Sequence, residues 1–233
     1  MDVLRITNLS KSFGSKKVLN ELSMTIPQGK IVGLLGPNAA GKTTLMKTIA
    51  GLLKPNAGEI KYPHDKKRGV GSKEVIAFLP DSLTFPAWMK VQDAFNFYQN
   101  MYPDFDRAKS KEMQEILQLS PNDTIKKLSK GMQERVALAV TFSRKAPLYL
   151  LDEPLGGIDP LGRMKVLQSI IATHTEESSI LLSTHLIKDV EMVFDSIAFI
   201  KDGKIALEED CETLRSQQGK KIEELYLEVF GGV

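Results

Sequence analysis

The sequence predicts an α/β protein built around a parallel β-sheet, with a helical segment inserted into the chain. An apolar run at residues 31–35 leads through a glycine-rich stretch into a helix-like segment, which is a strand–loop–helix pattern. Apolar runs and helical patterns then alternate between residues 148 and 200, as strands and crossover helices do in parallel sheets. Between these two parts, residues 91–146 show helical spacing, so this segment is the expected insertion.

The individual elements can be placed from apolar periodicity and turn residues. Strands are predicted, in order, at residues 3–7, 18–26, 31–35, 59–62, 75–79, 148–151, 179–183 and 197–200. Helices are predicted at residues 43–53, within 91–146, and at 161–173, 187–194 and 222–230. The basic, glycine-rich residues 66–73 are predicted to form a solvated loop.

The composition favours a soluble intracellular enzyme. A chain of 233 residues can bury a sizeable core as one domain, and 31 basic against 29 acidic residues give no strong field for nucleic acid or anionic lipid. The single cysteine, Cys211, excludes an intrachain disulfide framework, and the N-terminus lacks the pattern of a signal peptide. No apolar stretch approaches the roughly 20 residues that a membrane span requires. Any membrane role is therefore expected to come through a partner.

Residues 36–43 carry a phosphate-binding pattern, G-x-x-x-x-G-K-[ST], in a strand–loop–helix context. Glycines let the backbone turn tightly and bring N–H groups onto phosphate oxygens, and the helix N-terminus favours negative charge. Lys42 is expected to reach the β- and γ-phosphates and the Thr43 hydroxyl to ligate Mg²⁺. The residues expected to hold a nucleoside triphosphate here are Gly36, Asn38, Ala39, Ala40, Gly41, Lys42, Thr43 and Thr44. An accidental glycine-rich turn, the alternative, would not require these flanking elements.

The apolar run at residues 148–151 ends in two adjacent carboxylates, Asp152 and Glu153. Because the carboxyl ends of parallel strands gather at the ligand crevice, Asp152 is expected to face the phosphate loop and to hold Mg²⁺ through water. Glu153 is then placed to accept a proton from the attacking water. Two acids at a strand end are common without such chemistry, but a phosphate loop in the same chain favours the catalytic interpretation.

A second helix start lies between these motifs, at residues 128–133, Leu-Ser-Lys-Gly-Met-Gln. The Ser129 hydroxyl and the Gly131 amide can contact a γ-phosphate there, whereas the alternative is an ordinary helix cap. Ser129 and Gly131 match the L-S-G-G-Q signature motif of the nucleotide-binding subunit of an ABC transporter, and the order phosphate loop, signature, acidic strand is also that of the family. The chain resembles such a subunit over roughly residues 2–205. The resemblance implies a P-loop NTPase core with a parallel sheet, an N-terminal antiparallel β subdomain and an inserted α-helical subdomain.

The resemblance also implies how a single domain, residues 1–233, is divided. Residues 1–80 and 147–205 would form the catalytic core with the β subdomain. Residues 81–146 would form the helical subdomain with the signature, and residues 206–233 a C-terminal tail.

Three further residues are assigned by their positions in the family pattern. Asp159 would lie in a loop near the subunit boundary, and His185, after a buried strand, would contact the γ-phosphate and the attacking water. Phe13 would stack on adenine, although a lone aromatic or histidine is more often structural.

The chain departs from the family pattern in three places. Ala39 replaces a common glycine, which is tolerable if this residue keeps a negative φ. Lys130 and Met132 replace a glycine and a glutamine of the signature, a form frequent in ABC-2-type exporter ATPases. Asp81 stands where the family has a glutamine; a carboxylate accepts but cannot donate hydrogen bonds, so Asp81 would either ligate Mg²⁺ or alter the cation and permease contacts.

Taken with the resemblance, these residues predict the ATP-binding and ATP-hydrolysing subunit of a bacterial exporter, peripheral at the cytoplasmic face of the cell membrane. A homodimer, or a heterodimer with a sister ATPase, would enclose two ATP molecules and drive a separate permease. Lys42, Mg²⁺ and His185 would stabilise charge on the γ-phosphoryl group, and Glu153 would orient and deprotonate water. A soluble ABC ATPase acting on the ribosome or DNA is disfavoured by the near-neutral charge and single cassette, so no nucleic-acid partner is expected. A regulatory nucleotide-binding module is disfavoured by the presence of Glu153 and His185.

Overall fold

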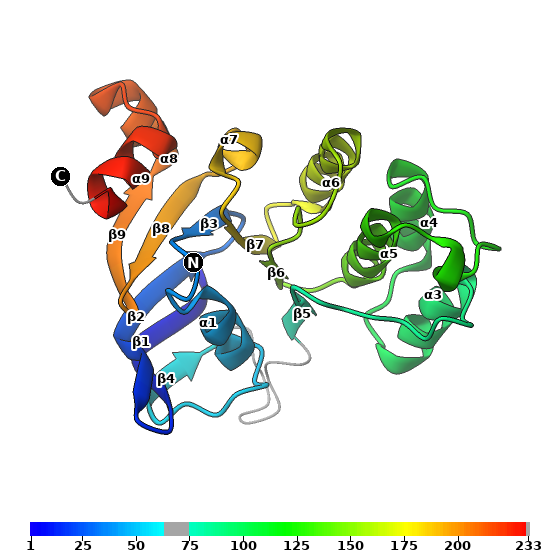
Figure 1. The fold of residues 1–233 in the computed structure, drawn as a ribbon, viewed down its shortest axis with the longest axis horizontal. Helices are drawn as coiled ribbons and strands as arrows, with labels where there is room; N and C mark the ends of the chain where they lie inside the picture. Colours follow the sequence, from blue (N-terminus) through cyan, green and yellow to red (C-terminus); the bar gives the residue numbers. More distant parts are fainter. Residues whose placement is uncertain (63–74, 232–233) are drawn as a thin grey trace.

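The computed structural model describes residues 1–62 and 75–231, and the loop predicted at residues 66–73 lies outside them. Two sheets and several helices make up the described chain (Figure 1). The strands are β1 (Asp2–Phe13), β2 (Lys16–Pro27), β3 (Ile31–Leu35), β4 (Ala57–Lys61), β5 (Ile76–Leu79), β6 (Leu148–Asp152), β7 (Ser179–Thr184), β8 (Ser196–Lys201) and β9 (Lys204–Asp210). The helices are α1 (Lys42–Ile49), α3 (Val91–Met101), α4 (Arg107–Ile116), α5 (Lys130–Phe142), α6 (Pro160–Thr173), α7 (Ile187–Val190), α8 (Cys211–Thr213) and α9 (Ile222–Phe230), with a 3₁₀ turn at Ile125–Lys127 and a π-helical turn at Leu214–Gln218.

The larger sheet has the strand order β5-β6-β7-β3-β8-β9. Neighbours from β5 to β8 are parallel, and only the edge strand β9 runs antiparallel to its neighbour within this sheet. Every residue of β3, β6 and β7 is buried, as expected for central strands covered on both faces. The predicted parallel α/β core is confirmed, and the parallel direction gathers the carboxyl ends of β3, β6 and β7 at one edge.

The smaller sheet is antiparallel, with the order β2-β1-β4. Strand β2 alternates between exposed and buried side chains, with Leu22, Met24 and Ile26 facing inward. The predicted N-terminal antiparallel subdomain is thereby confirmed. Strand β1 is longer than predicted from residues 3–7 and extends to Phe13, because its polar second half still pairs with β2.

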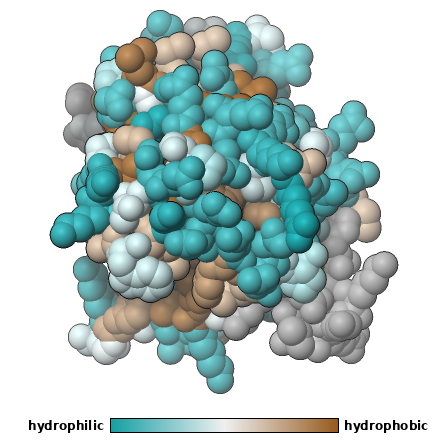
Figure 2. Space-filling view, turned by 90° about the vertical axis from the view of Figure 1, so that its right-hand side faces the viewer, coloured by the Kyte–Doolittle hydropathy of each residue, from teal (hydrophilic) through white to brown (hydrophobic). Residues whose placement is uncertain are grey.

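Helices α3, α4 and α5 gather at the end of the molecule opposite the smaller sheet (Figure 1). Helix α5 is apolar and fully buried over residues 136–142, whereas α4 buries only Ser110 and Met113. The outer face of this helical segment is mostly hydrophilic (Figure 2). The predicted helical insertion is therefore present, with α5 as its buried element.

The prediction that a tail begins at residue 206 is wrong, because β9 spans that position and pairs with β8. Ile205 and Leu207 are half-buried, while Ala206 between them is exposed. The acidic side chains Glu208 and Glu209 hide this short alternation in the sequence. Beyond β9, helix α9 has the predicted bounds, Ile222–Phe230.

Arg144 connects the helical segment to the larger sheet. Its guanidinium is buried, donates to both carboxylate oxygens of Asp104 at 2.9–3.1 Å, and donates to the Ile76 carbonyl oxygen at 2.7 Å. It also lies 4.0 Å from the ring centroid of Tyr102. Because Asp104 follows α3 and Ile76 begins β5, one side chain links the two parts.

We expect Arg144→Met to lower the free energy of unfolding by about 3 kcal/mol, because it leaves Asp104 and the Ile76 carbonyl without their donor. Chemical denaturation followed by circular dichroism measures this loss. Lys145→Met is the matched control, because the Lys145 side chain is 71% exposed in its ion pair with Asp106 and should cost less than about 1 kcal/mol. Equal, small losses in both variants would contradict the connecting role of Arg144.

Candidate functional site

A cleft of about 1010 Å³ lies at the carboxyl ends of β3, β6 and β7. Predicted site residues line much of it: Phe13, Asn38, Ala39, Ala40, Gly41, Lys42, Thr43, Thr44, Asp81, Glu153 and His185. Gly36 and Asp152 are buried behind this lining. The structure therefore brings the phosphate loop, the acidic end of β6 and the predicted histidine together at one place.

The phosphate loop follows β3 directly and begins α1 at Lys42. Gly36 has no room for a side chain, since a Cβ there would lie 2.5 Å from the Ile200 carbonyl oxygen. Gly41 has a φ of 111°, which only glycine adopts at no steric cost. The loop is thus held against the end of β8 by two glycines.

The condition under which an alanine would be free of strain at position 39, a negative φ, is not met, because the φ of Ala39 is 65°. The residue is exposed, and its left-handed conformation costs an alanine about 1–2 kcal/mol. Ala39 is therefore a strained residue in a functional loop.

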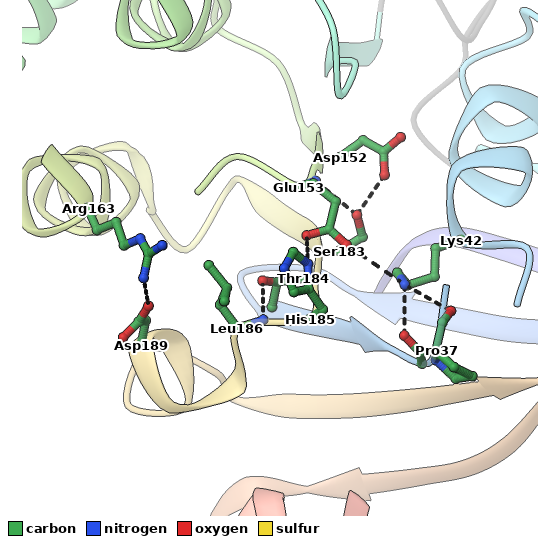
Figure 3. A network of polar contacts seen from close by, with 11 residues as sticks. Pro37, Lys42, Asp152, Glu153, Arg163, Ser183, Thr184, His185, Leu186 and Asp189 are labelled. Carbon is green, nitrogen blue, oxygen red and sulfur yellow. Dashed lines mark hydrogen bonds and ion pairs between the residues drawn. The ribbon is translucent and has the colours of Figure 1, made fainter. Parts of the chain in front are cut away.

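The Lys42 side chain is 7% exposed and points back into its own loop (Figure 3). Its ammonium donates to the carbonyl oxygens of Gly36 at 2.8 Å and Pro37 at 3.2 Å, and lies 3.8 Å from Oε1 of Glu153. Burial lowers the pKa of Lys42, while the negative charges of Glu153 and Asp152 oppose that shift. A phosphate entering the cleft would meet a buried cation.

Ser183 joins the Asp152 carboxylate to the Glu153 backbone at the end of β6 (Figure 3). Its hydroxyl donates to Oδ1 of Asp152 at 2.7 Å and accepts the Glu153 N–H at 3.0 Å. Strands β6 and β7 place Asp152 directly opposite Ser183 in parallel register. The role of Ser183 was not predicted from the sequence. A serine after an apolar run does not indicate which strand lies beside it, and here that strand is β6.

Glu153 leaves β6 with a φ of 52°, an uncommon backbone conformation for a glutamate. This turn directs its carboxylate to two partners, with Oε2 lying 2.8 Å from Nδ1 of His185 and Oε1 facing Lys42. The His185 side chain is about half exposed, at the mouth of the cleft. A carboxylate held between an ammonium and an imidazole can position a water molecule and accept its proton.

Asp152 offers a suitable ligand atom for Mg²⁺. The side chain is 1% exposed, and its Oδ2 atom has no hydrogen-bond partner in the described part of the chain. Burial raises the pKa of Asp152, although contacts with the Ser183 and Thr43 hydroxyls favour the charged form. Residues 1–62 and 75–231 contain no group of three or more His, Cys, Asp or Glu side chains that could hold a metal ion without other ligands. Such a donor set fits Mg²⁺, which takes one or two protein ligands and completes its shell with phosphates and water.

The signature residues are placed elsewhere. Ser129 caps α5, where its hydroxyl accepts the Met132 N–H at 3.3 Å, and neither Ser129 nor Gly131 lines the cleft. Asp159 caps α6 by accepting the Gly162 N–H at 3.0 Å, which lowers the pKa of Asp159, and it also lies outside the cleft. The structure does not bring these three residues to the phosphate loop of the same chain.

Phe13 and Asp81 lie on the borders of the site. Phe13 is 50% exposed at the end of β1, with the Lys11 ammonium 5.1 Å from its ring centroid, so its ring is available for stacking. Asp81 is exposed and lines both the cleft and a small cavity that also contacts Asp152 and Glu134.

Comparisons with known proteins agree with one another. The sequence matches the family model described as ABC transporter over residues 19–156. It is 31% identical over 232 residues to the uncharacterized ABC transporter ATP-binding protein YcbN of Bacillus subtilis (strain 168), covering 95% of this chain and 74% of that protein. It is 30% identical over 214 residues to the lantibiotic transport ATP-binding protein SrtF of Streptococcus pyogenes, covering 90% of this chain and 92% of that protein. A solved structure described as the ATP binding subunit of an ABC transporter aligns with a TM-score of 0.86 at 26% identity, over 97% of this chain and 99% of that one.

We expect Asp152→Asn to stabilise the protein in the absence of nucleotide and metal at neutral pH. Because burial raises the pKa of Asp152, the ionised carboxylate costs stability above that pKa, and a neutral amide removes the cost. Thermal unfolding with a chelator present should show a melting temperature about 2–4 °C higher, the shift that about 1 kcal/mol gives in a chain of this size.

Measuring the melting temperatures of Asp152→Asn and the wild type at lower pH checks the cause of this difference. Below its raised pKa the wild-type carboxyl is protonated in the fold, so the difference from Asp152→Asn should shrink as the pH falls through that pKa. The exposed Glu177→Gln serves as the control and should change the melting temperature little. A lower melting temperature for Asp152→Asn at neutral pH would contradict the expectation.

Proposed function

The chain belongs to the ABC transporter family of ATP-binding proteins, and we propose that it is the ATP-hydrolysing subunit of a bacterial exporter that drives a separate membrane permease. As an ABC ATPase, it takes ATP as its substrate. The convergence of Lys42, Glu153 and His185 at one cleft is the observation that carries the proposal. Within the described residues no helix is long and apolar enough to span a bilayer. As part of this proposal, we assign the chain to the cytoplasmic face of the membrane, where it would be bound through its permease.

ATP binding rests on the phosphate loop and the start of α1. The backbone amides of residues 38–44 would surround the phosphate oxygens, and the α1 N-terminus would favour their charge. The Lys42 ammonium would exchange a loop carbonyl for the β- and γ-phosphates. Phe13 would stack on adenine at the outer border of the cleft.

Asp152 and Thr43 are the residues we propose to hold Mg²⁺, with Asp81 as a third candidate. The unpaired Oδ2 atom of Asp152 supports this assignment, and so does the proximity of the Thr43 hydroxyl to the Asp152 carboxyl group. Bound with ATP, Mg²⁺ would neutralise charge on the β- and γ-phosphate oxygens. Asp81 lies on the border of the same region, where a carboxylate adds negative charge that the family's glutamine does not.

Hydrolysis depends on the carboxylate of Glu153. It would orient a water molecule in line with the γ-phosphorus and accept its proton, while His185 and Lys42 stabilise the developing charge. The Ser183 hydroxyl would hold the Glu153 backbone in its turned conformation. Almost all the catalysis is therefore positioning and electrostatics, as phosphoryl transfer requires.

A second subunit would complete each site. Ser129 and Gly131 form an exposed helix N-terminus that does not reach the cleft of its own chain, which supports their contact with the γ-phosphate bound by a partner. Asp159 would lie near the same boundary. The partner is either a second copy or a sister ATPase, and we propose no nucleic-acid partner.

Export rather than import is supported by the form of the signature, Leu-Ser-Lys-Gly-Met, which is frequent in ABC-2-type exporter ATPases. A relative of nearly the same length is named as a lantibiotic transport protein, which supports transport as the process that this ATPase drives.

Glu153→Gln should bind ATP but lose turnover by at least about a hundredfold, because an amide cannot accept the proton of the attacking water. A coupled ATPase assay measures turnover, and calorimetric titration with ATP measures binding. Glu177→Gln changes an exposed carboxylate outside the cleft and should hydrolyse ATP at the wild-type rate. Wild-type turnover by Glu153→Gln would contradict the general-base assignment.

Mixing two inactive variants should restore activity if the signature acts across a dimer. Lys42→Ala removes a phosphate contact and Ser129→Arg blocks the signature, so a mixed homodimer contains one intact site and one site with both defects. About one quarter of wild-type turnover is expected at equal amounts, since about half of randomly paired dimers are mixed. Each variant alone is the control. Absence of recovery in a mixture shown to contain mixed dimers would contradict the proposal that Ser129 acts in trans.

A further inference from the structure

The cleft extends beyond the residues that the proposed mechanism uses. Past the phosphate loop, it is lined by the β8–β9 turn, Lys201 to Gly203, and by Phe230 in the last turn of α9. Neither the signature, the phosphate loop nor the acidic strand includes these residues. A residue near the end of the chain thus borders the same cleft as Lys42.

Helix α9 is firmly attached beside β8. Ile222 and Leu225 are buried, and the rings of Tyr226 and Phe230 both contact the buried Phe199 of β8, with ring centroids 5.8 and 5.5 Å away. Tyr226 and Phe230 also contact each other, at 4.4 Å. The Phe230 ring is therefore held in place at the cleft.

Lys201 holds the last turn of α9 beside the cleft and also places a positive charge at the cleft. Its ammonium donates to the Val229 carbonyl oxygen at 2.9 Å and lies 5.8 Å from the Phe230 ring centroid. An ammonium has three N–H donors, and this is the one hydrogen bond that the described part of the chain gives it. The side chain is exposed on the cleft, so its other donors can reach an anionic ligand.

The β8–β9 turn also adjoins the strand that follows Phe13. Gly203 has a φ of 72° and packs so closely that a Cβ there would lie 2.3 Å from the Val18 carbonyl oxygen. The Asn20 N–H donates to the Gly203 carbonyl oxygen at 2.9 Å. Phe13, the start of β2, the turn and Phe230 therefore form one continuous wall of the cleft.

We propose that this C-terminal wall is part of the nucleotide site, with Phe230 and Lys201 contacting the bound nucleotide. Phe230 offers an apolar ring to the nucleoside, and Lys201 offers an ammonium to the phosphates. This inference rests on the ATP site of the proposed function. Helix α9 would then be a nucleotide-binding element of the protein.

The test is calorimetric titration of full-length variants with Mg²⁺ and ATP. Phe230→Ala should raise the Kd for ATP roughly three- to tenfold, which is the low end of the loss for an aromatic contact to a nucleotide. Leu227→Ala is the matched control, because Leu227 lies in the same helix, is 61% exposed and does not line the cleft; its Kd should equal that of the wild type. A wild-type Kd for Phe230→Ala would overturn this inference alone, whereas failure of the wild-type protein to bind ATP would reject the proposed function as well.

Two further variants separate contact with the nucleotide from loosening of α9. Tyr226→Leu disturbs the same aromatic cluster without lining the cleft, so it should lower the melting temperature and leave the Kd within about twofold of the wild type. Lys201→Met keeps the apolar stem but removes the charge, so it should raise the Kd roughly two- to fivefold and weaken its salt dependence. Equal losses of ATP affinity in Tyr226→Leu and Phe230→Ala, or a wild-type Kd for Lys201→Met, would overturn the inference.

Discussion

The parallel register between β6 and β7 determines where both carboxylates of the site lie. It sets Asp152 opposite Ser183, and the single Ser183 hydroxyl then binds the Asp152 side chain and the Glu153 backbone. With that backbone held at a positive φ, the Glu153 side chain turns toward Lys42 and His185. These residues come from the ends of three strands, β3, β6 and β7, or from the segments that directly follow them. The site therefore depends on the order of strands in the sheet more than on any one motif.

Much of the fold and most of the phosphate-binding site could be predicted from the sequence, because the signals are local. Residues 36–43 specify a loop between a strand and a helix, and the apolar run before Asp152 specifies a buried strand. Parallel strands bring their carboxyl ends together, so the meeting of Lys42 and Glu153 follows from the fold class. The resemblance to ABC transporter subunits supplied His185 and Phe13, whose surroundings alone would not have distinguished them from structural residues.

Other features depend on neighbours that the sequence does not reveal. Ser183 is an ordinary serine until the strand beside it is known, and β9 is obscured by acidic side chains within its alternation. The positive φ of Ala39 is set by the path of the loop and runs against the backbone preference of alanine. Phe230 lies 188 positions after Lys42 in the chain, and only the packing of α9 against Phe199 brings it to the same cleft.

The phosphate loop supplies hydrogen-bond partners for its own lysine. The Lys42 ammonium already bonds to two carbonyl oxygens of the loop, so an arriving phosphate replaces existing partners instead of meeting an unoccupied cation. The binding enthalpy is then the difference between the bonds of Lys42 to phosphate and its bonds to the loop carbonyls. The loop loses little conformational entropy on binding, because the bonds to Lys42 already hold its shape. Replacing Lys42 by a shorter residue would remove its hydrogen bonds to the two loop carbonyl oxygens together with its contact to phosphate. The affinity lost on truncation therefore measures reorganisation of the loop as well as attraction to phosphate, and exceeds the strength of the contact itself.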